Sequence, residues 1–231
     1  MDAAIEVVQR FAGRAAADEV DLLVFPECFL QGYLVTQEHV HGRAFEFGSA
    51  EFDGILARLE GLQPVLVFGM IERLGHRYYN TAAVIEDGRV MGRYRKTFLT
   101  SGESAFTCGD DYPVFDVGGV RFGINICYDT QFPEAAAAVA AGGASVLLVP
   151  AQNMMRREKA VWWQDRHNEI WAHRARETGM WLASADVTGK RDDDRVGLGP
   201  TSFLSPSGEV TAQVPIGYIG MVIADVTRVC R

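Results

Sequence analysis

The sequence predicts an α/β fold made of two similar halves. Each half of the 231-residue chain shows an apolar repeat at helical spacing, a short apolar run, a second helix, a second run and a hairpin. Short apolar runs between helices are typical of buried strands. Because 48% of the residues are hydrophobic, the chain can form one large core, and we expect a single domain over residues 1–231.

The first half begins with apolar residues at helical spacing ahead of Asp21. A helix-period pattern that ends at Gly61 predicts the second helix, because glycine commonly ends helices. Asp87-Gly88 is a strong signal for a hairpin turn. The elements expected are a helix before residue 21, a strand over 22–25, a helix over 52–59, and strands over 65–71, 80–85 and 90–94.

The second half begins with a strand ahead of its first helix, and the first half shows no counterpart to that strand. We therefore expect that the usual N-terminal strand is missing, in a shortened chain or one whose true start lies upstream. Residues 190–199 are charged and glycine-rich, which is typical of a solvated, mobile loop. The elements expected are strands over 120–126, 145–149, 181–187, 202–204, 210–214 and 218–226, a helix over 133–141, and one long helix over 159–178.

Charge and composition exclude several classes of partner. The formal net charge of −8 disfavours nucleic acid and anionic membrane surfaces. The apolar stretches are much shorter than the roughly 20 residues of a membrane-spanning helix, and the N-terminus lacks the pattern of a secretory signal. We therefore expect a cytoplasmic protein with reduced thiols. The cysteines and histidines show no metal-site spacing, so no metal is expected.

Cys127 is the strongest candidate for a nucleophile. It follows an apolar strand and is followed almost at once by Pro133-Glu134, which begins a helix. A sulfur at such a turn faces the positive end of the next helix, which favours the reactive thiolate. The alternative, a small buried apolar side chain, does not explain these neighbours. That alternative is retained for Cys28, Cys108 and Cys230.

Three charged residues complete a possible acyl-transfer site. Glu27 ends an apolar strand, where partial burial would raise its pKa and make it a better base. Lys96 follows a hairpin and could supply a fixed positive charge beside a developing oxyanion. Glu103 could hold that lysine or relay a proton. Each also has an ordinary interpretation as a solvated side chain. None of the histidines carries a motif for the alternative Cys–His mechanism.

Taken together, these segments resemble the Glu-Lys-Cys signature of the nitrilase superfamily of carbon-nitrogen hydrolases. The segments are Phe25-Pro26-Glu27, Tyr94-Arg95-Lys96 and Ile126-Cys127-Tyr128-Asp129, and the resemblance continues through residues 132–134, 174–178 and 199–208. Three motifs in this order are specific evidence for the family, whereas each motif alone would be weak evidence. The resemblance implies a four-layer αββα sandwich. The chain departs from the family pattern at its N-terminus, where we expect the usual first strand to be missing.

The resemblance also implies a mechanism. Glu27 would be the general base, Cys127 the nucleophile and Lys96 the oxyanion stabiliser, with help from the backbone N–H of Tyr128. Glu103 resembles the second glutamate of the family. The expected reaction is hydrolysis of a small amide through a cysteine thioester, with release of ammonia or an amine. No cofactor is implied, and a homodimer or higher homo-oligomer is expected.

The substrate remains open between an amide and an N-carbamoyl compound. Nitrile-cleaving members typically follow the cysteine with Trp-Glu, and Tyr128-Asp129 stands here instead, which favours amides. Thr130-Gln131 replaces the arginine often found in members that bind carboxylate-bearing substrates. Membrane-embedded acyltransferases and glutamine-dependent synthetases are not expected, since the sequence shows neither spanning helices nor a second domain. A non-catalytic protein that retains the fold is the alternative from another class.

Overall fold

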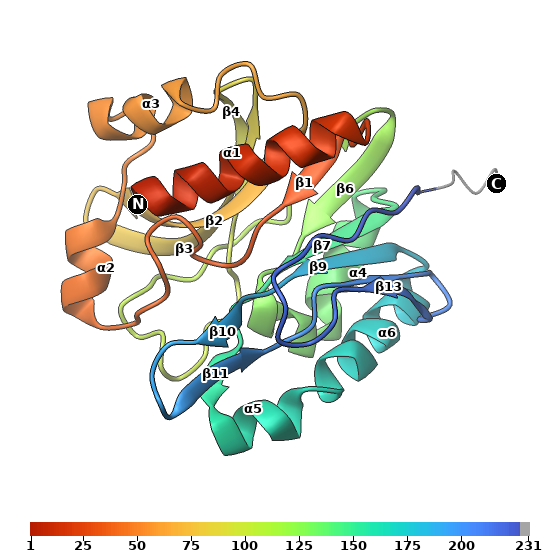
Figure 1. Ribbon diagram of the computed structural model, residues 1–231. Helices are drawn as coiled ribbons and strands as arrows, with labels where there is room; N and C mark the ends of the chain where they lie inside the picture. The colour runs from red at the N-terminus through yellow and green to blue at the C-terminus, as the bar shows by residue number, and fades with distance from the viewer. Residues whose placement is uncertain (227–231) are drawn as a thin grey trace. The chain divides into compact units, whose positions relative to one another are not determined.

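The computed structural model describes residues 1–226 and divides the chain into two compact units, Met1–Asp111 and Tyr112–Arg231 (Figure 1). Each unit has its own sheet and its own helices. The single domain expected over residues 1–231 stays a prediction.

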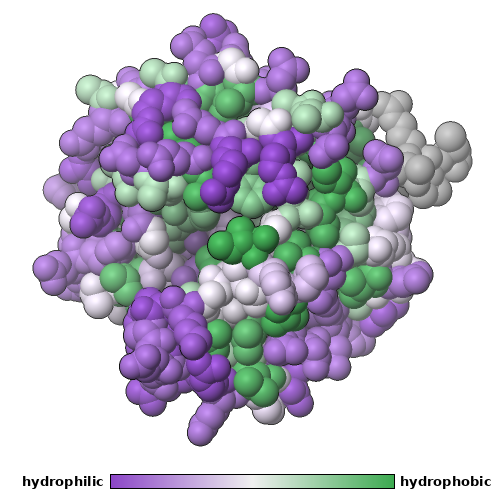
Figure 2. All heavy atoms as spheres, in the orientation of Figure 1, coloured by the Kyte–Doolittle hydropathy of each residue, from purple (hydrophilic) through white to green (hydrophobic). Residues whose placement is uncertain are grey.

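The first unit contains a four-stranded sheet in the order β1-β2-β3-β4. Strand β1 runs parallel to β2, whereas β2, β3 and β4 form an antiparallel meander. Helix α1 packs near the end of β1, since the ring of Phe11 lies edge-on to that of Phe25. The outward face of α1 is largely hydrophilic (Figure 2). The elements are α1 (Asp2–Ala17), β1 (Leu22–Val24), α2 (Gln37–Arg43), α3 (Ala50–Ala57), β2 (Val65–Leu74), β3 (Arg77–Glu86) and β4 (Arg89–Arg95).

The second unit contains a six-stranded sheet in the order β13-β12-β9-β7-β6-β5 and a three-stranded sheet in the order β10-β11-β8. The central strands β6, β7 and β9 are parallel, so their carboxyl ends lie at one edge of the sheet. Helices α4 and α6 contribute to a core around the buried Trp171. The elements before residue 151 are β5 (Val114–Val117), β6 (Val120–Ile124), a 3₁₀ turn η1 (Cys127–Gln131), α4 (Pro133–Ala141) and β7 (Val146–Pro150). The later elements are β8 (Met154–Arg156), α5 (Arg157–Trp163), α6 (Arg166–Thr178), β9 (Trp181–Ala185), β10 (Thr188–Lys190), β11 (Arg195–Leu198), β12 (Ser202–Leu204) and β13 (Val210–Gln213).

Most predicted elements are confirmed within a few residues, but the single long helix over 159–178 is wrong. The chain turns at residues 164–165 and forms two helices, α5 and α6. The guanidinium of Arg166 bonds to the carbonyl oxygen of Trp162, and the ring of Trp163 stacks on His167. Because apolar residues continue at helical spacing across the turn, periodicity alone did not reveal the break.

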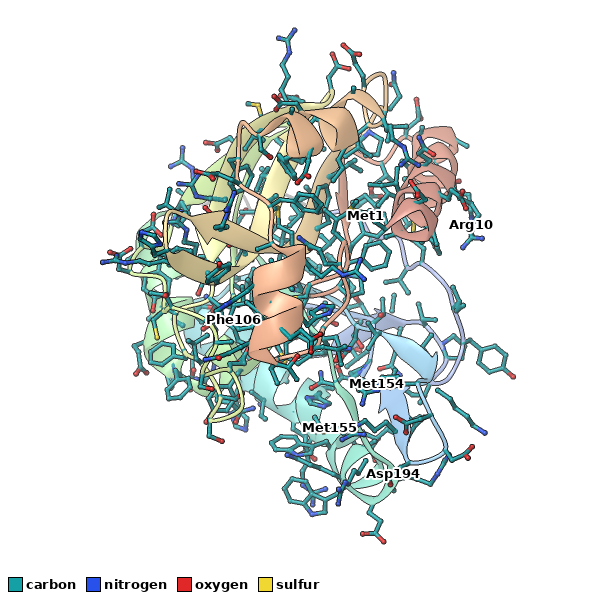
Figure 3. The ribbon with its side chains drawn as sticks, turned by 90° about the vertical axis from the view of Figure 1, so that its left-hand side faces the viewer. Met1, Arg10, Phe106, Met154, Met155 and Asp194 are labelled. Atoms are coloured by element: carbon teal, nitrogen blue, oxygen red, sulfur yellow. The ribbon has the colours of Figure 1, made fainter. Side chains whose placement is uncertain are left out.

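Two further predictions in the second unit are corrected. The solvated loop over 190–199 contains strand β11, which pairs with β10 and with β8. Figure 3 shows Met154, Met155 and Asp194 close together in this part of the second unit. Residues 218–226 form no strand, and the six-stranded sheet ends at β13. Helix α2 and strand β5 were not predicted, since both are short and largely polar or half-buried.

Candidate active site

Glu27 is held in the first unit by a turn that packs directly on strand β2. The N–H of Gly69 donates to the carbonyl oxygen of Pro26 at 3.0 Å, and the N–H of Leu30 donates to that of Gly69 at 3.0 Å. A Cβ at position 69 would lie 2.2 Å from the Cys28 nitrogen and 2.6 Å from the Glu27 carbonyl carbon. Only glycine permits this contact, so the sequence fixes where the carboxylate of Glu27 leaves the sheet.

Lys96 lies immediately after β4 and is anchored by its backbone. Its N–H donates to the carbonyl oxygen of Asn80 at 2.8 Å, and its own carbonyl oxygen accepts from Gly109 at 2.8 Å. Its Nζ donates to Glu27 Oε1 at 2.7 Å and to Glu103 Oε1 at 2.9 Å. The Nδ2 of Asn80 donates to the same two oxygens, at 2.7 and 3.1 Å. One ammonium and one carboxamide therefore bridge two carboxylates.

This cluster is fully buried, which rules out the ordinary interpretation of its members as solvated side chains. Glu27 and Lys96 are each 1% exposed, and Glu103 is 0% exposed. Carboxylates and ammonium groups are seldom buried to this degree unless they are paired. The structure brings the three side chains into contact, and Phe106 packs nearby in a small core with Cys28, Val40 and Ile71 beside α2 (Figure 3).

The pKa values of the two glutamates are shifted in opposite directions. Burial raises the pKa of Glu27, and the charge of Glu103 adds to this effect, while the ammonium of Lys96 acts against it. Burial also acts to raise the pKa of Glu103, but the ammonium of Lys96 and hydrogen bonds from Lys96, Thr100 and Asn80 outweigh it and leave this pKa lowered. The surroundings of Glu103 therefore favour its charged form, whereas those of Glu27 favour its neutral form.

Cys127 lies in the second unit, at the first position of the 3₁₀ turn that follows β6. Its φ of 46° lies in the left-handed region, which is strained for a residue with a side chain. Asp129 holds the turn: its Oδ2 accepts from the Ile126 N–H at 2.8 Å, and its own N–H donates to the Ile126 carbonyl oxygen at 3.0 Å. The hydroxyl of Thr130 donates to the Cys127 carbonyl oxygen at 2.7 Å. The thiol is half-exposed and accessible.

The position of the following helix differs from the prediction. We expected the sulfur to face the positive end of the helix beginning at Pro133, but the 3₁₀ turn separates Cys127 from α4. The backbone N–H of Tyr128 directly follows Cys127 at the start of this turn, where the first N–H groups have no partner within the helix. Cys28 is buried as expected, whereas Cys108 is exposed, so the expectation of a buried side chain is wrong there. Cys230 lies outside the described residues.

A buried pair, Asn153 and Asp186, lies beside Cys127 in the second unit. The Cys127 Sγ donates to Asn153 Oδ1 at 3.8 Å, and Asn153 Nδ2 donates to Asp186 Oδ2 at 2.5 Å. The first residue follows β7 and the second follows β9, at the carboxyl edge that also carries Cys127. Sequence reasoning missed this pair and Asn80. For the pair, a polar residue beyond each buried apolar strand was the available signal, whereas Asn80 lies within β3.

Within residues 1–226, no three or more His, Cys, Asp or Glu side chains are grouped so that they could hold a metal ion. In the same part of the chain, no helix has the length and apolar character needed to cross a membrane.

Comparison with known proteins identifies the family. The model of the family described as carbon-nitrogen hydrolase matches residues 2–230. An (R)-stereoselective amidase from a Pseudomonas species is 30% identical over 84% of this chain and 69% of its own length. A glutamine-dependent NAD(+) synthetase from Rhodobacter capsulatus is 33% identical over 94% of this chain, which spans only 39% of that protein. The expectation that excluded glutamine-dependent synthetases for this chain is therefore withdrawn.

A crystal structure of an amidase from Nesterenkonia sp., a member of the nitrilase superfamily, superposes on this chain with a TM-score of 0.77. It is 28% identical in sequence, and the match covers 93% of this chain and 81% of that one. The chain therefore has the α/β fold of the nitrilase superfamily and belongs to the carbon-nitrogen hydrolase family.

Proposed function

We propose that this protein hydrolyses a small amide through a thioester on Cys127. In the proposed reaction, Glu27 takes the thiol proton and the sulfur attacks the carbonyl carbon. The C–N bond breaks, and the leaving nitrogen takes that proton from Glu27 and departs as ammonia or an amine. Water then gives a proton to Glu27 and attacks the thioester, so that the carboxylic acid is released and Glu27 returns the proton to the sulfur.

Lys96 and the backbone N–H of Tyr128 supply the positive charge and the hydrogen bond that stabilise the oxyanion in this mechanism. Glu103 holds Lys96 in place, since its lowered pKa maintains a negative charge beside the ammonium. The observation that carries the proposal is the buried Glu27–Lys96–Glu103 cluster. A sheet does not need three buried charges for its stability, and the cluster separates a proton-exchanging carboxyl from a permanent anion.

The half-exposed Cys127 at a strained strand-end turn is a second support. In one mutant of the Nesterenkonia amidase, acrylamide forms a Michael adduct at the active-site cysteine, and a second mutant, which lacks that cysteine, forms a complex with butyramide. These two amides are therefore suitable first probes for this chain. Short aliphatic amides are the preferred substrate class, with N-carbamoyl compounds as the alternative.

Glutamine is a second candidate substrate, because the chain is 33% identical to a glutamine-dependent NAD(+) synthetase. Its side chain is itself a primary amide, so the proposed chemistry would be the same. The absence of an arginine shortly after Cys127 weighs against substrates that carry a carboxylate. Comparing ammonia release from butyramide, glutamine, an N-carbamoyl amino acid and butyronitrile distinguishes these classes.

The deciding experiment measures ammonia release by the purified protein and by Cys127→Ala, Cys127→Ser and Glu27→Gln variants. All three are expected to lose turnover while their circular dichroism and melting temperature show that they remain folded. Turnover by folded Cys127→Ala would refute the thioester mechanism, and turnover by Glu27→Gln would favour a Cys–His enzyme. If the wild-type protein releases no ammonia and iodoacetamide modifies Cys127 no faster than a peptide thiol, the non-catalytic alternative is supported.

The homodimer and the cytoplasmic location implied by the resemblance stay predictions. Light scattering on the purified protein tests the first of them.

A further inference from the structure

The side-chain amide of Asn153 has its orientation determined by Asp186. The carboxylate of Asp186 can only accept hydrogen bonds, so the group that faces its Oδ2 at 2.5 Å must be the Nδ2 of Asn153. The Oδ1 of Asn153 therefore points the other way, toward the Sγ of Cys127 at 3.8 Å. The atom presented to the nucleophile is a hydrogen-bond acceptor.

The hydrogen bonds and the packing of Asp186 hold the Asn153 amide in this orientation. Its Oδ1 accepts from the backbone N–H groups of Asn153 at 2.9 Å and Val187 at 2.8 Å, in addition to the bond at Oδ2. Asn153 and Asp186 are both buried. A Cβ at Gly199 would lie 1.8 Å from Asp186 Oδ2 and 3.0 Å from the Cβ of Asn153, so only glycine leaves room for the pair.

An acceptor at this position cannot assist the charged groups of the reaction. Oδ1 would repel both the thiolate of Cys127 and an oxyanion, and Nδ2 is already committed to Asp186. The acceptor can be satisfied by the thiol proton before the reaction and, once that proton has left, by an N–H of a bound molecule. Amides carry such an N–H on the leaving nitrogen, whereas esters and nitriles do not.

We propose that Asn153 Oδ1 binds the N–H of the substrate's leaving nitrogen and thereby selects amides over acyl compounds without an N–H. This inference rests on the proposed function. Asp186 acts as the positioning residue that keeps the oxygen, rather than the NH₂ group, facing the substrate. Binding one N–H through Oδ1 also leaves the nitrogen lone pair free to take the proton as the C–N bond breaks.

The distances are compatible with this arrangement. A carbonyl carbon poised for attack lies about 3–3.5 Å from the sulfur, and an N–H···O bond spans about 2.7–3.2 Å. Because Sγ and Oδ1 are 3.8 Å apart, one amide group can contact both atoms at once, with its carbon at the sulfur and its nitrogen at the oxygen.

The test compares two substrates that deliver the same butyryl group to Cys127. Butyramide has N–H groups on its leaving nitrogen, and p-nitrophenyl butyrate has none. Asn153→Leu removes the acceptor with a similar side-chain size. We expect this variant to lower kcat/KM for butyramide by about 10- to 100-fold, the loss typical of an unpaired buried hydrogen-bonding group, and not to lower kcat/KM for the ester, which has no N–H for Oδ1 to bind. Equal losses on both substrates, or no loss on butyramide, would overturn the inference.

A second variant tests the positioning role. Asp186→Asn allows either end of the Asn153 amide to face Cys127, so the preference for butyramide over the ester should fall while circular dichroism and the melting temperature show that the variant remains folded. Asp186→Asn with an unchanged preference would show that the carboxylate has only a structural role. Gly199→Ala, which crowds the same carboxylate, should shift the preference in the same direction in whatever fraction remains folded.

The same contrast can be measured without turnover. In a Cys127→Ala background, nuclear magnetic resonance titration should show that Asn153→Leu weakens binding of butyramide more than binding of methyl butyrate. Equal weakening contradicts the assigned role of Asn153. Failure of the proposed function has a different signature, namely that Cys127→Ala retains turnover or that the wild-type protein hydrolyses neither butyryl compound.

Discussion

Replacing Lys96 with methionine tests whether the buried charges of the first unit are balanced as described. The ammonium makes bonds of 2.7 and 2.9 Å to Glu27 and Glu103, and all three side chains are at most 1% exposed. Lys96→Met keeps the length of the side chain but leaves two buried carboxylates without a counter-ion. Removing one partner of a buried ion pair costs about 3–5 kcal/mol, which corresponds to a loss of about 6–20 °C in melting temperature for a chain of this size.

The effect should depend on pH in a defined direction. The ammonium of Lys96 lowers the pKa of both glutamates, so its removal raises both values. The folded variant then binds protons more readily than its unfolded state, and its stability falls as pH rises above the ordinary carboxyl range. The difference from wild type should therefore be larger at pH 7.5 than at pH 5.

Urea titrations of both proteins at these two pH values, followed by circular dichroism, provide the measurement. Lys159 on α5 is exposed, and Lys159→Met is the matched control, expected to change stability by less than about 0.5 kcal/mol. A Lys96→Met variant destabilised by under about 1 kcal/mol, or equally at both pH values, would refute the account of the cluster as a buried, mutually dependent set of charges.

Three further outcomes are expected. Gly69→Ala should destabilise the protein by at least about 2 kcal/mol, because its Cβ would lie 2.2 Å from the Cys28 nitrogen. Gly54→Ala, in helix α3 where a Cβ meets no neighbour, should instead stabilise the protein by about 0.5–1 kcal/mol. Similar urea midpoints for the two variants would contradict this expectation. Burial lowers the pKa of His167 to about 4, so the fold should lose stability as pH falls from about 6.5 to about 4. The variant His167→Phe should reduce that loss. An imidazole that titrates near pH 6.5 by nuclear magnetic resonance would be inconsistent with the buried position of His167. Under native conditions, acrylamide should modify the half-exposed Cys127 and leave the buried Cys28 unmodified, and peptide mass spectrometry showing the reverse would exclude the described turn.

Much of the first unit could be predicted because its signals are local. Asp87-Gly88 marked the hairpin between β3 and β4, and the apolar run after Asp21 marked β1. The candidate residues Glu27, Lys96 and Cys127 were found because each ends an apolar run in an order that resembles one family. Short motifs can be recognised from the sequence alone, since they depend only on neighbouring residues.

The wrong predictions share a cause, which is that the segments that contact one another in the fold are distant in the sequence. Strand β11 exists because residues 154–156 lie beside it, whereas residues 218–226 form no strand although their sequence pattern predicts one. The helix over 159–178 breaks at residues 164–165 within a pattern that continues on either side. Propensity and periodicity describe each segment alone, whereas these outcomes depend on neighbours brought together by folding.

The sequence by itself determined the α/β class, the family and the residue types suited to acyl transfer, because these follow from local patterns and ordered motifs. Only the tertiary structure decided their electrostatics. Lys96 becomes a buried ammonium shared by two carboxylates because Asn80 and Gly109 hold its backbone, and the pKa values of Glu27 and Glu103 diverge because burial and hydrogen bonds act on them unequally. The acceptor that Asn153 presents to Cys127 likewise depends on Asp186, more than 30 positions along the chain. Such contacts are set by three-dimensional packing, which no single segment encodes.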